Sequence, residues 1–245
     1  MSNKTRLDVL LVEQGLQESR QKAQATIMAG IVYVNNQKVD KPGTAVPNDA
    51  HIEVRGKTLR YVSRGGLKLE KAMDNFDVVL EGKVCMDVGS STGGFTDCLL
   101  RRGASSVLSV DVGYAQFDWA LRQDARVTLM ERTNIVDVPA AVGASCVDLA
   151  VCDVSFTSVT TVLPAVMELL RPHGAFLTLV KPQFEAARED VGEGGVVRDQ
   201  AVRDAAIERV RLAFEEAGLN VAGVCESPIH GHKGNVEYLL LGTRG

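Results

Sequence analysis

Lysine and carboxylate side chains stand at four positions beside expected strand ends: Lys68 in "SRGGLKLEKA", Asp153 in "CDVSF", Lys181 in "LVKPQFE" and Glu237 in "GNVEYLL". A lysine at the carboxyl end of an apolar strand is unusual unless it is used. A lysine whose pKa is lowered by burial or by a neighbouring cation can take a proton from an alcohol. Two lysines flanked by two carboxylates therefore suit a reaction at a hydroxyl group, with one carboxylate orienting the base and the other balancing charge.

A glycine-rich segment, "VCMDVGSSTGGFTDCLL" (84–100), joins an apolar strand to a helical pattern. It lacks the GK[ST] of a phosphate-binding loop, and its glycines are spaced Gly89-x-x-x-Gly93-Gly94 rather than GxGxxG. Asp87 ends the strand where a carboxylate would repel a pyrophosphate but attract a cation. D-x-G-x-x-x-G-G-F is typical of sites for S-adenosylmethionine (AdoMet), whose sulfonium and amine are positive. Glycines let the backbone approach such a ligand closely.

Two later strand ends add candidate contacts for AdoMet. Asp111 stands 24 residues after Asp87 and is placed to accept the ribose hydroxyls, or else to cap the following helix. Asn134 follows the third strand, where its amide could meet adenine or simply form a turn. The predicted AdoMet-binding set is Asp87, Gly89, Ser90, Ser91, Thr92, Gly93, Gly94, Phe95, Asp111, Asn134 and Asp153.

Strand and helix patterns alternate from Val84 onward and must position these residues. Apolar strands are expected at 84–89, 106–113, 127–131, 147–156, 175–182, 220–229 and 236–243, and helices at 94–102, 115–123, 158–171 and 199–217. Apolar strands separated by helices predict an α/β fold whose parallel sheet is covered on both faces. The last two strands are joined by "HGHKGN", which leaves no room for a helix, so they should pair antiparallel.

The first quarter of the chain differs in charge from the rest. Residues 1–71 carry 12 basic and 7 acidic side chains, whereas residues 72–245 carry 15 and 24. Helices are expected after Thr5, with Asp8 completing a capping box, and after Ser19 as N-cap, followed by short strands. A basic module on an acidic body suggests nucleic-acid binding, although a solvated basic face is also common. The candidate phosphate contacts are Arg6, Arg20, Lys22, Lys38, Lys41 and Arg64.

Composition narrows the class of protein further. Hydrophobic residues make up 45% and charged residues 24% of the 245, which is ordinary for a globular protein. No apolar run approaches the roughly 18–20 residues of a membrane span, and the N-terminus lacks a signal-peptide pattern. Five cysteines show no CxxC spacing, and His230 and His232 lack partners at ligand spacing. These features predict a cytoplasmic protein without membrane or metal partners, and they indicate no oligomeric state.

The motifs together resemble a known family. Residues 63–245 resemble the FtsJ-type 2′-O-ribose methyltransferases, whose Lys-Asp-Lys-Glu tetrad matches Lys68, Asp153, Lys181 and Glu237. Residues 1–60 resemble the RNA-binding domain named after ribosomal protein S-four. In this order, with "RLD", "SRQKAQ", "VSRGGLKL", "DVGSSTGGFT" and "GEGGVVRD", the chain resembles the TlyA (hemolysin A) family.

The resemblance implies a Rossmann-like class I methyltransferase, with a mostly parallel seven-stranded sheet and an antiparallel final strand, preceded by a small α+β RNA-binding domain. It places the RNA-binding domain at 1–59, a linker at 60–63 and the methyltransferase domain at 64–245. It further implies AdoMet as methyl donor and ribosomal RNA or ribosomal subunits as partner, with cytidine 2′-OH groups modified in 23S rRNA and, in some members, 16S rRNA.

Within this resemblance, Lys181 would activate the 2′-OH and Asp153 would hold Lys181 near the sulfonium. Lys68 and Glu237 would complete the network and position the ribose. Two other functions stay open: a non-catalytic rRNA-binding or ribosome assembly factor, and a hemolysin-like membrane-active protein. An intact tetrad argues against the first, and the lack of a strongly amphipathic basic helix argues against the second.

Overall fold

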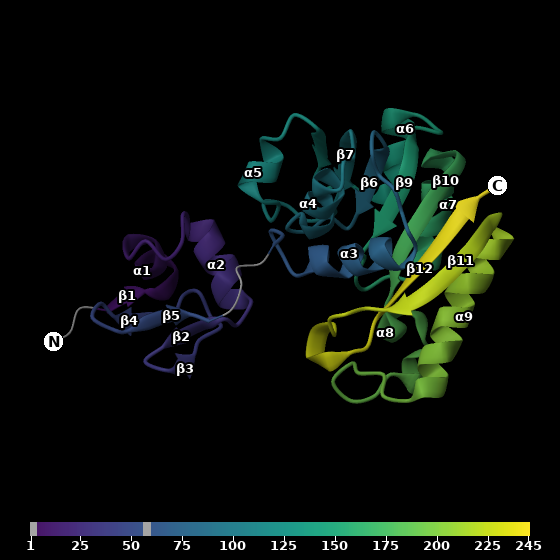
Figure 1. The fold of residues 1–245 in the computed structure, drawn as a ribbon. Coiled ribbons are helices and arrows are strands. Elements are labelled where there is room, and N and C mark those ends of the chain that lie inside the picture. The colour runs from purple at the N-terminus through teal and green to yellow at the C-terminus, as the bar shows by residue number, and fades with distance from the viewer. Residues whose placement is uncertain (1–3, 56–59) are drawn as a thin grey trace. The chain divides into compact units, whose positions relative to one another are not determined.

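The chain forms two compact units, residues 1–64 and 65–245, in a computed structural model that describes residues 4–55 and 60–245 (Figure 1). The predicted linker, 60–63, falls at the end of the first unit, and residues 1–3 and 56–59 of the predicted first domain lie outside the described residues. The exact domain boundaries stay predictions. Over the described ranges, no helix is long and apolar enough to cross a membrane.

The first unit packs two helices on short antiparallel strands. Its elements are β1 (Lys4–Arg6), α1 (Leu7–Glu13), α2 (Arg20–Met28), β2 (Val32–Val34), β3 (Gln37–Lys38), β4 (Ala45–Pro47) and β5 (Ile52–Val54). Strand β2 lies between β3 and β5, and β1 pairs with β4. Leu7, Leu11 and Ile27 are fully buried at the centre of its core. As predicted, Ser19 caps α2, because its Oγ accepts a hydrogen bond from Lys22 N at 3.2 Å.

Helix α1 does not begin with the predicted capping box. Thr5 lies in β1, and the N-cap residue, Arg6, makes no side-chain cap hydrogen bond. Asp8 is instead fully buried, and its carboxylate accepts hydrogen bonds from Arg6, Arg20 and Gln24. The capping box fails because three side-chain donors, two of them charged guanidinium groups, bind the carboxylate in place of a backbone amide.

The second unit is built on a seven-stranded sheet in the order β11-β12-β10-β9-β6-β7-β8. The strands are β6 (Val84–Val88), β7 (Ser106–Val110), β8 (Val127–Met130), β9 (Val147–Cys152), β10 (Leu170–Val180), β11 (Leu219–Glu226) and β12 (Tyr238–Arg244). Strand β12 runs antiparallel to both of its neighbours, and the strands from β10 to β8 run parallel. The predicted Rossmann-like architecture is therefore confirmed.

Helices cover both faces of this sheet. They are α3 (Gly65–Asn75), α4 (Gly94–Arg101), α5 (Trp119–Arg122), α6 (Val138–Val142), α7 (Val159–Leu169), α8 (Pro182–Glu185) and α9 (Gln200–Glu216), with 3-10 turns at 135–137, 188–190 and 232–234. On β6, Met86 and Val88 join the core cluster that contains residues of α7 and α9, whereas Asp87 points the other way and bonds Thr96 of α4. The sequence patterns did not predict α3, α6 or α8.

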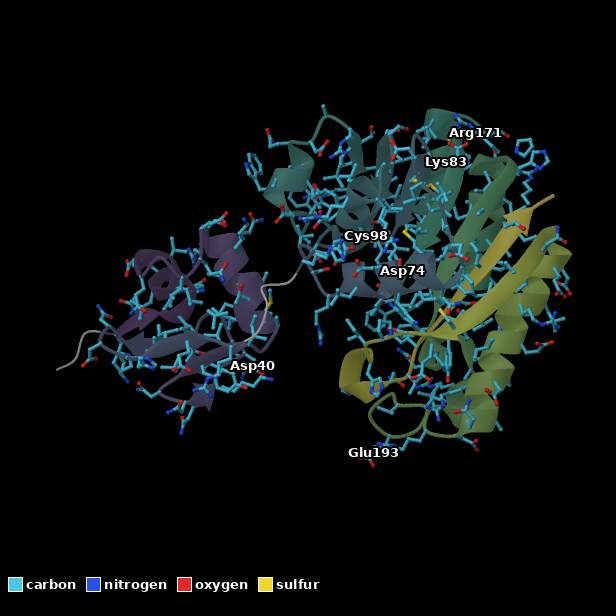
Figure 2. All side chains as sticks on the ribbon, viewed as in Figure 1. Asp40, Asp74, Lys83, Cys98, Arg171 and Glu193 are labelled. Atoms are coloured by element: carbon cyan, nitrogen blue, oxygen red, sulfur yellow. The ribbon has the colours of Figure 1, made fainter. Side chains whose placement is uncertain are left out.

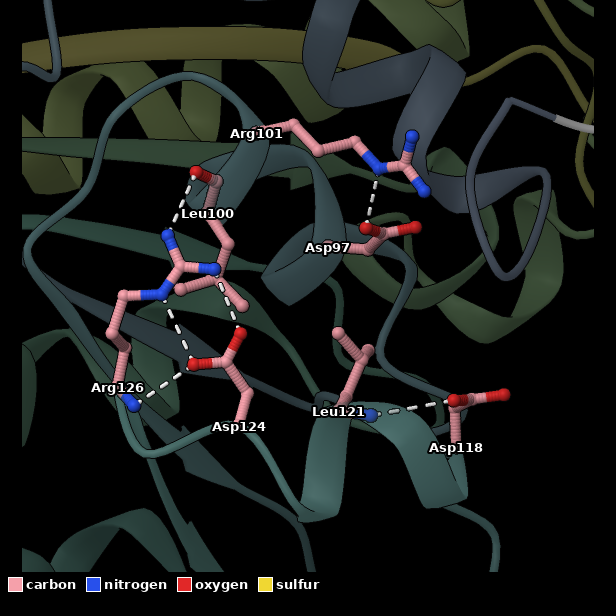
Figure 3. Close-up of polar contacts among 7 residues, drawn as sticks. All are labelled: Asp97, Leu100, Arg101, Asp118, Leu121, Asp124 and Arg126. Carbon is pink, nitrogen blue, oxygen red and sulfur yellow. Dashed lines mark hydrogen bonds and ion pairs between the residues drawn. The ribbon is translucent and has the colours of Figure 1, made fainter.

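Polar contacts hold the start of α5 and both ends of α4 in place. Asp118 caps α5 by accepting hydrogen bonds from Ala120 N and Leu121 N (Figure 3). Arg126 bonds Asp124 through two nitrogens and reaches the carbonyl of Leu100 at the end of α4. Asp118 also joins the start of α5 to the glycine-rich segment, because its backbone N donates to Thr92 O, whereas the Arg126 contacts hold the opposite end of α4.

Hydrogen bonds to Asp148 join the amino-terminal ends of three parallel strands. Asp148 accepts hydrogen bonds from Val84 N at 2.8 Å and from Arg171 Nη1 at 3.0 Å, which ties together the starts of β6, β9 and β10. Figure 2 shows Lys83 and Arg171 at this edge, and Glu193 at the opposite edge on the connection between α8 and α9. The carboxyl ends of the parallel strands are left for the candidate site.

Candidate active site

The four predicted catalytic residues meet at one edge of the second unit. Asp153 follows β9, Lys181 follows β10 and Glu237 precedes β12, while Lys68 lies in α3. Strands β10 and β12 pair Val180 with Tyr238, so the antiparallel register brings Lys181 and Glu237 to neighbouring positions just beyond the strand ends. The fold thus gathers side chains that the sequence spreads over 169 positions.

These residues form two ion pairs of zero net charge. Lys181 Nζ lies 2.5 Å from Asp153 Oδ1 and donates to Ser155 Oγ at 2.9 Å. Lys68 Nζ donates to Glu237 Oε2 at 2.6 Å. The side chain of Asp153 is 23% exposed, compared with 9% for Lys181 and 3% for Glu237. Charged groups this buried are stable only when they are paired, and the Asp153–Lys181 pair retains access from solvent.

The Glu237 carboxylate is held by the turn that precedes β12. A Cβ atom added to Gly231 would overlap its Oε1, so only glycine leaves room for the carboxylate there. Glu237 O accepts a hydrogen bond from Ser227 N at 2.9 Å, and Gly231 N donates to Asn235 O at 2.8 Å. Asn235, 2% exposed, also binds Gly195 O and Val197 N through its side chain. The turn is therefore fastened to the connection between α8 and α9.

The glycine-rich loop runs directly against the backbone of Asp153. Gly89 has φ +81°, and a Cβ there would lie 2.7 Å from the carbonyl oxygen of Asp153. Gly93 has φ +92°, and its Cβ would lie 2.5 Å from Leu121 Cδ1. Any other residue would be both strained and obstructed at these two positions. The loop can pass this close to Asp153 only because the positions are glycine.

Asp87 contributes charge rather than an exposed contact. Its side chain is fully buried, and Oδ2 accepts hydrogen bonds from Thr96 N at 3.0 Å and Thr96 Oγ1 at 2.7 Å. Burial is the main cause that raises the pKa of Asp87 to about 7; the negative charges of Asp153 and Asp111 add to it, and the hydrogen bonds from Thr96 oppose it. The carboxylates of Asp87, Asp111 and Asp153 lie near one another and together favour a cationic ligand.

The loop also holds polar atoms that no described residue satisfies. Asp87 Oδ1 and Ser90 Oγ are buried and have no hydrogen-bond partner among the described residues. Buried polar atoms are normally paired, so one at the end of β6 and one on the loop that follows point to a ligand that completes the site. The residues present therefore fit AdoMet, a cation with several hydrogen-bonding groups.

Other predicted AdoMet contacts are already engaged within the protein. Asp111 accepts hydrogen bonds from Ser91 N and Gly113 N, each at 2.6 Å. Asn134 caps the following 3-10 turn by accepting from Val136 N, and Phe95 is 4% exposed. Thr92 accepts a bond from Asp118 through its carbonyl. Asp111 does not cap the following helix, because the N-cap of α5 is Asp118, whereas Asn134 does form the turn considered for it. The roles of both residues in binding AdoMet stay predictions.

Sequence reasoning missed four residues beside Lys181. Ser155 binds Lys181 directly, and Phe156 is 92% exposed with φ +64°. The rings of Phe156 and Phe184 lie 5.3 Å apart, and Lys181 Nζ lies 5.9 Å from the centre of the Phe184 ring. Glu185 is buried and bonds the start of α7. An exposed aromatic ring held at positive φ could have been suspected only from the structure.

The predicted phosphate contacts lie on the surface of the first unit. Arg6 and Arg20 both bind the buried Asp8, at 2.9 and 3.0 Å. Lys22 pairs with Glu18, whereas Lys38, Lys41 and Arg64 have exposed side chains. Asp8 therefore fixes the direction of two guanidinium groups. The contribution of all six to RNA binding stays a prediction.

The described parts of the chain contain no group of three or more His, Cys, Asp or Glu side chains arranged to hold a metal ion.

These features define a methyltransferase of the AdoMet-dependent Rossmann-like class: the order of the strands in the sheet, the glycine-rich loop, and an acidic site whose unpaired polar atoms a ligand would satisfy. Comparison with known proteins agrees: the FtsJ-like methyltransferase model matches residues 61–244 and the S4 domain model matches residues 5–52. The chain belongs to the FtsJ-like methyltransferase family.

Relatives cover nearly the whole chain. The protein YqxC of Bacillus subtilis is 52% identical over 98% of this chain and 85% of its own length. The 16S/23S rRNA (cytidine-2′-O)-methyltransferase TlyA of Mycobacterium tuberculosis is 44% identical over 98% of this chain and 90% of its own. A solved structure from Streptococcus thermophilus has a TM-score of 0.78 at 42% identity and covers 100% of this chain and 90% of that one.

Proposed function

We propose that this protein is an AdoMet-dependent 2′-O-ribose methyltransferase whose substrate is a cytidine of ribosomal RNA, in 23S rRNA and also in 16S rRNA. The observation that carries the proposal is the convergence of two buried lysine–carboxylate pairs at neighbouring strand ends, with Asp153 of one pair against the glycine-rich loop. An RNA substrate also fits the first unit, because this unit is basic and the S4 domain model matches it. Such a substrate would place the enzyme in the cytoplasm.

Each residue of the tetrad has a role in this proposal. Asp153 and Ser155 hold the Lys181 amine in place; once this amine has released its ammonium proton to solvent, its lone pair accepts a hydrogen bond from the target hydroxyl and takes the hydroxyl proton. Lys68 and Glu237 position the ribose from the neighbouring strand end. AdoMet supplies an already activated methyl group, so much of the rate should come from alignment of the hydroxyl rather than from acid–base strength.

Phe156 suits recognition of the target nucleotide. Its ring stands in solvent beside the Lys181 pair, and an aromatic face binds a base by stacking regardless of its identity. Contacts of Arg6 and Arg20 with phosphates would position the RNA rather than read its sequence.

The direct test is transfer of tritium from labelled AdoMet to ribosomal subunits and to naked rRNA, with methylated sites then mapped on both rRNAs. Transfer to a cytidine ribose is expected, and it should disappear in a folded Lys181→Met variant. Absence of transfer to every substrate would instead favour an RNA-binding assembly factor. Lysis of erythrocytes by the pure protein would favour a membrane-active one.

A further inference from the structure

The connection between β9 and α7, residues 153–158, carries much of the chemistry proposed above. Asp153 and Ser155 bind Lys181, and Phe156 presents its ring to solvent. Phe156 has φ +64°, a conformation that a bulky side chain rarely adopts. Such a conformation persists only where the surrounding structure imposes it. Something must therefore hold this connection in place.

The buried carboxylate of Glu185 provides that hold at the far end of the connection. Glu185 is 2% exposed, and its Oε2 accepts a hydrogen bond from Ser158 Oγ at 2.6 Å. Its Oε1 accepts from Val159 N, the first residue of α7, at 2.8 Å. A carboxylate at the N-terminus of an eleven-residue helix satisfies a free amide and is favoured by the helix dipole.

Glu185 and Lys181 belong to the same short turn of chain. Lys181 is the N-cap of α8 and Glu185 is its last residue, while Phe184 between them contacts Phe156. One end of this turn binds Asp153 and Ser155, and the other end binds Ser158 and Val159. The connection is therefore clamped at both ends by a single helical turn.

We propose that Glu185 is a positioning residue for the reaction: its carboxylate fixes residues 153–158 so that Asp153 and Ser155 hold Lys181, and Phe156 faces the substrate. The proposal rests on the function proposed above. Glu185 acts through the connection and not on the reacting atoms. Its loss should therefore lower the rate at saturating RNA and leave binding of AdoMet almost unchanged.

The test compares Glu185→Gln and Glu185→Ala in the full chain. Glu168→Gln, at the exposed other end of α7, is the matched control. Single-turnover methyl transfer to rRNA should fall about tenfold in Glu185→Gln, which keeps one acceptor, and about 10²-fold in Glu185→Ala. The RNA concentration for half-maximal rate and the AdoMet dissociation constant should stay within about threefold. The control should react at the wild-type rate.

Hydrogen exchange distinguishes positioning from mere stability. Amides of residues 153–159 should exchange faster in both Glu185 variants, while those of β6 and β10 keep their protection. A folded Glu185→Gln variant with wild-type rate and wild-type exchange at 153–159 would overturn the proposal, even if Glu185→Ala fails to fold. If the wild-type protein transfers no methyl group to rRNA, the proposed function fails, and exchange at 153–159 still decides whether Glu185 holds the connection.

Discussion

Replacing Lys181 with methionine separates the chemistry of the site from its stability. Methionine keeps most of the buried volume of the lysine stem but removes the amine that binds Asp153 and Ser155. Loss of a general base typically costs 10²–10⁴-fold in rate, so single-turnover methyl transfer should fall by about that factor. Binding of AdoMet should persist, because Lys181 is not among its predicted contacts.

The same change leaves the Asp153 carboxylate without its cation. An exposed ion pair contributes at most about 1 kcal/mol, whereas breaking a buried one costs about 3–5 kcal/mol. With Asp153 at 23% exposure, the free energy of unfolding should fall by about 1–3 kcal/mol. Adding Asp153→Asn should recover part of this stability because the unpaired charge is gone, yet activity should stay low.

Three measurements decide this prediction: tritium transfer to ribosomal subunits in a single turnover, calorimetric titration with AdoMet, and urea unfolding of the wild-type, single and double variants. A folded Lys181→Met protein that binds AdoMet and methylates within about threefold of the wild-type rate would refute the assigned role, since that difference is below the smallest effect expected for a base.

Three further changes test other parts of the structure. Because the pKa of Asp87 is raised to about 7, this carboxyl should release a proton when cationic AdoMet binds. The affinity for AdoMet should therefore rise by up to about tenfold per pH unit between pH 5 and 7 and then level off. Calorimetry of Asp87→Asn should show a flatter dependence of affinity on pH. Asp8→Asn should weaken RNA binding in a salt titration although it removes a negative charge, because Arg20 loses its orientation; tighter binding would contradict this reasoning. Gly231→Ala should displace the Glu237 carboxylate and lower the methylation rate by about 10²-fold without changing AdoMet affinity, and an unchanged rate would show that this carboxylate need not be held in place.

The raised pKa of Asp87 also sets a sign for stability against pH. Its folded pKa of about 7 exceeds the value near 4 of an unfolded aspartate, so the folded state binds more protons between these values. Stability from this group is therefore greatest below about pH 4 and is lost as the pH rises through about 7. Asp8 acts in the opposite direction: the Arg6 guanidinium beside it lowers the pKa of its carboxyl, so its stabilisation is present at neutral pH and lost in acid.

Local patterns predicted the sheet and the strand ends well. Apolar runs predicted all seven strands of the second unit. For the parallel strands this follows because a strand covered on both faces is continuously apolar, whereas β11 alternates between buried and exposed residues. The tetrad could be found for the same reason: a charged residue directly after such a run, such as Lys181, conflicts with burial and therefore stands out. The pairing of the last two strands also followed from their short connection.

What could not be predicted depends on contacts between distant positions. Helix α3 begins with two glycines, so its sequence resembled a loop, and its place is set by packing on α4 and by the pair of Lys68 with Glu237. Asp8 satisfied a local capping pattern, but two arginines and a glutamine captured it. The role of Glu185 could not be predicted from the sequence for the same reason, since its partner Ser158 lies 27 residues away.

The unequal burial of the two ion pairs divides their work. Glu237 is 3% exposed and lies against Gly231, whereas Lys68 is 12% exposed, so this pair has a fixed carboxylate and a lysine that solvent can reach. Asp153 is 23% exposed, lies against the glycine-rich loop and shares Lys181 with a serine. Lys181 can take a proton only if a substrate can reach its amine, and the partly exposed side of its pair with Asp153 allows this. We therefore expect the Lys181–Asp153 pair to take part in the reaction and the Lys68–Glu237 pair to position the ribose.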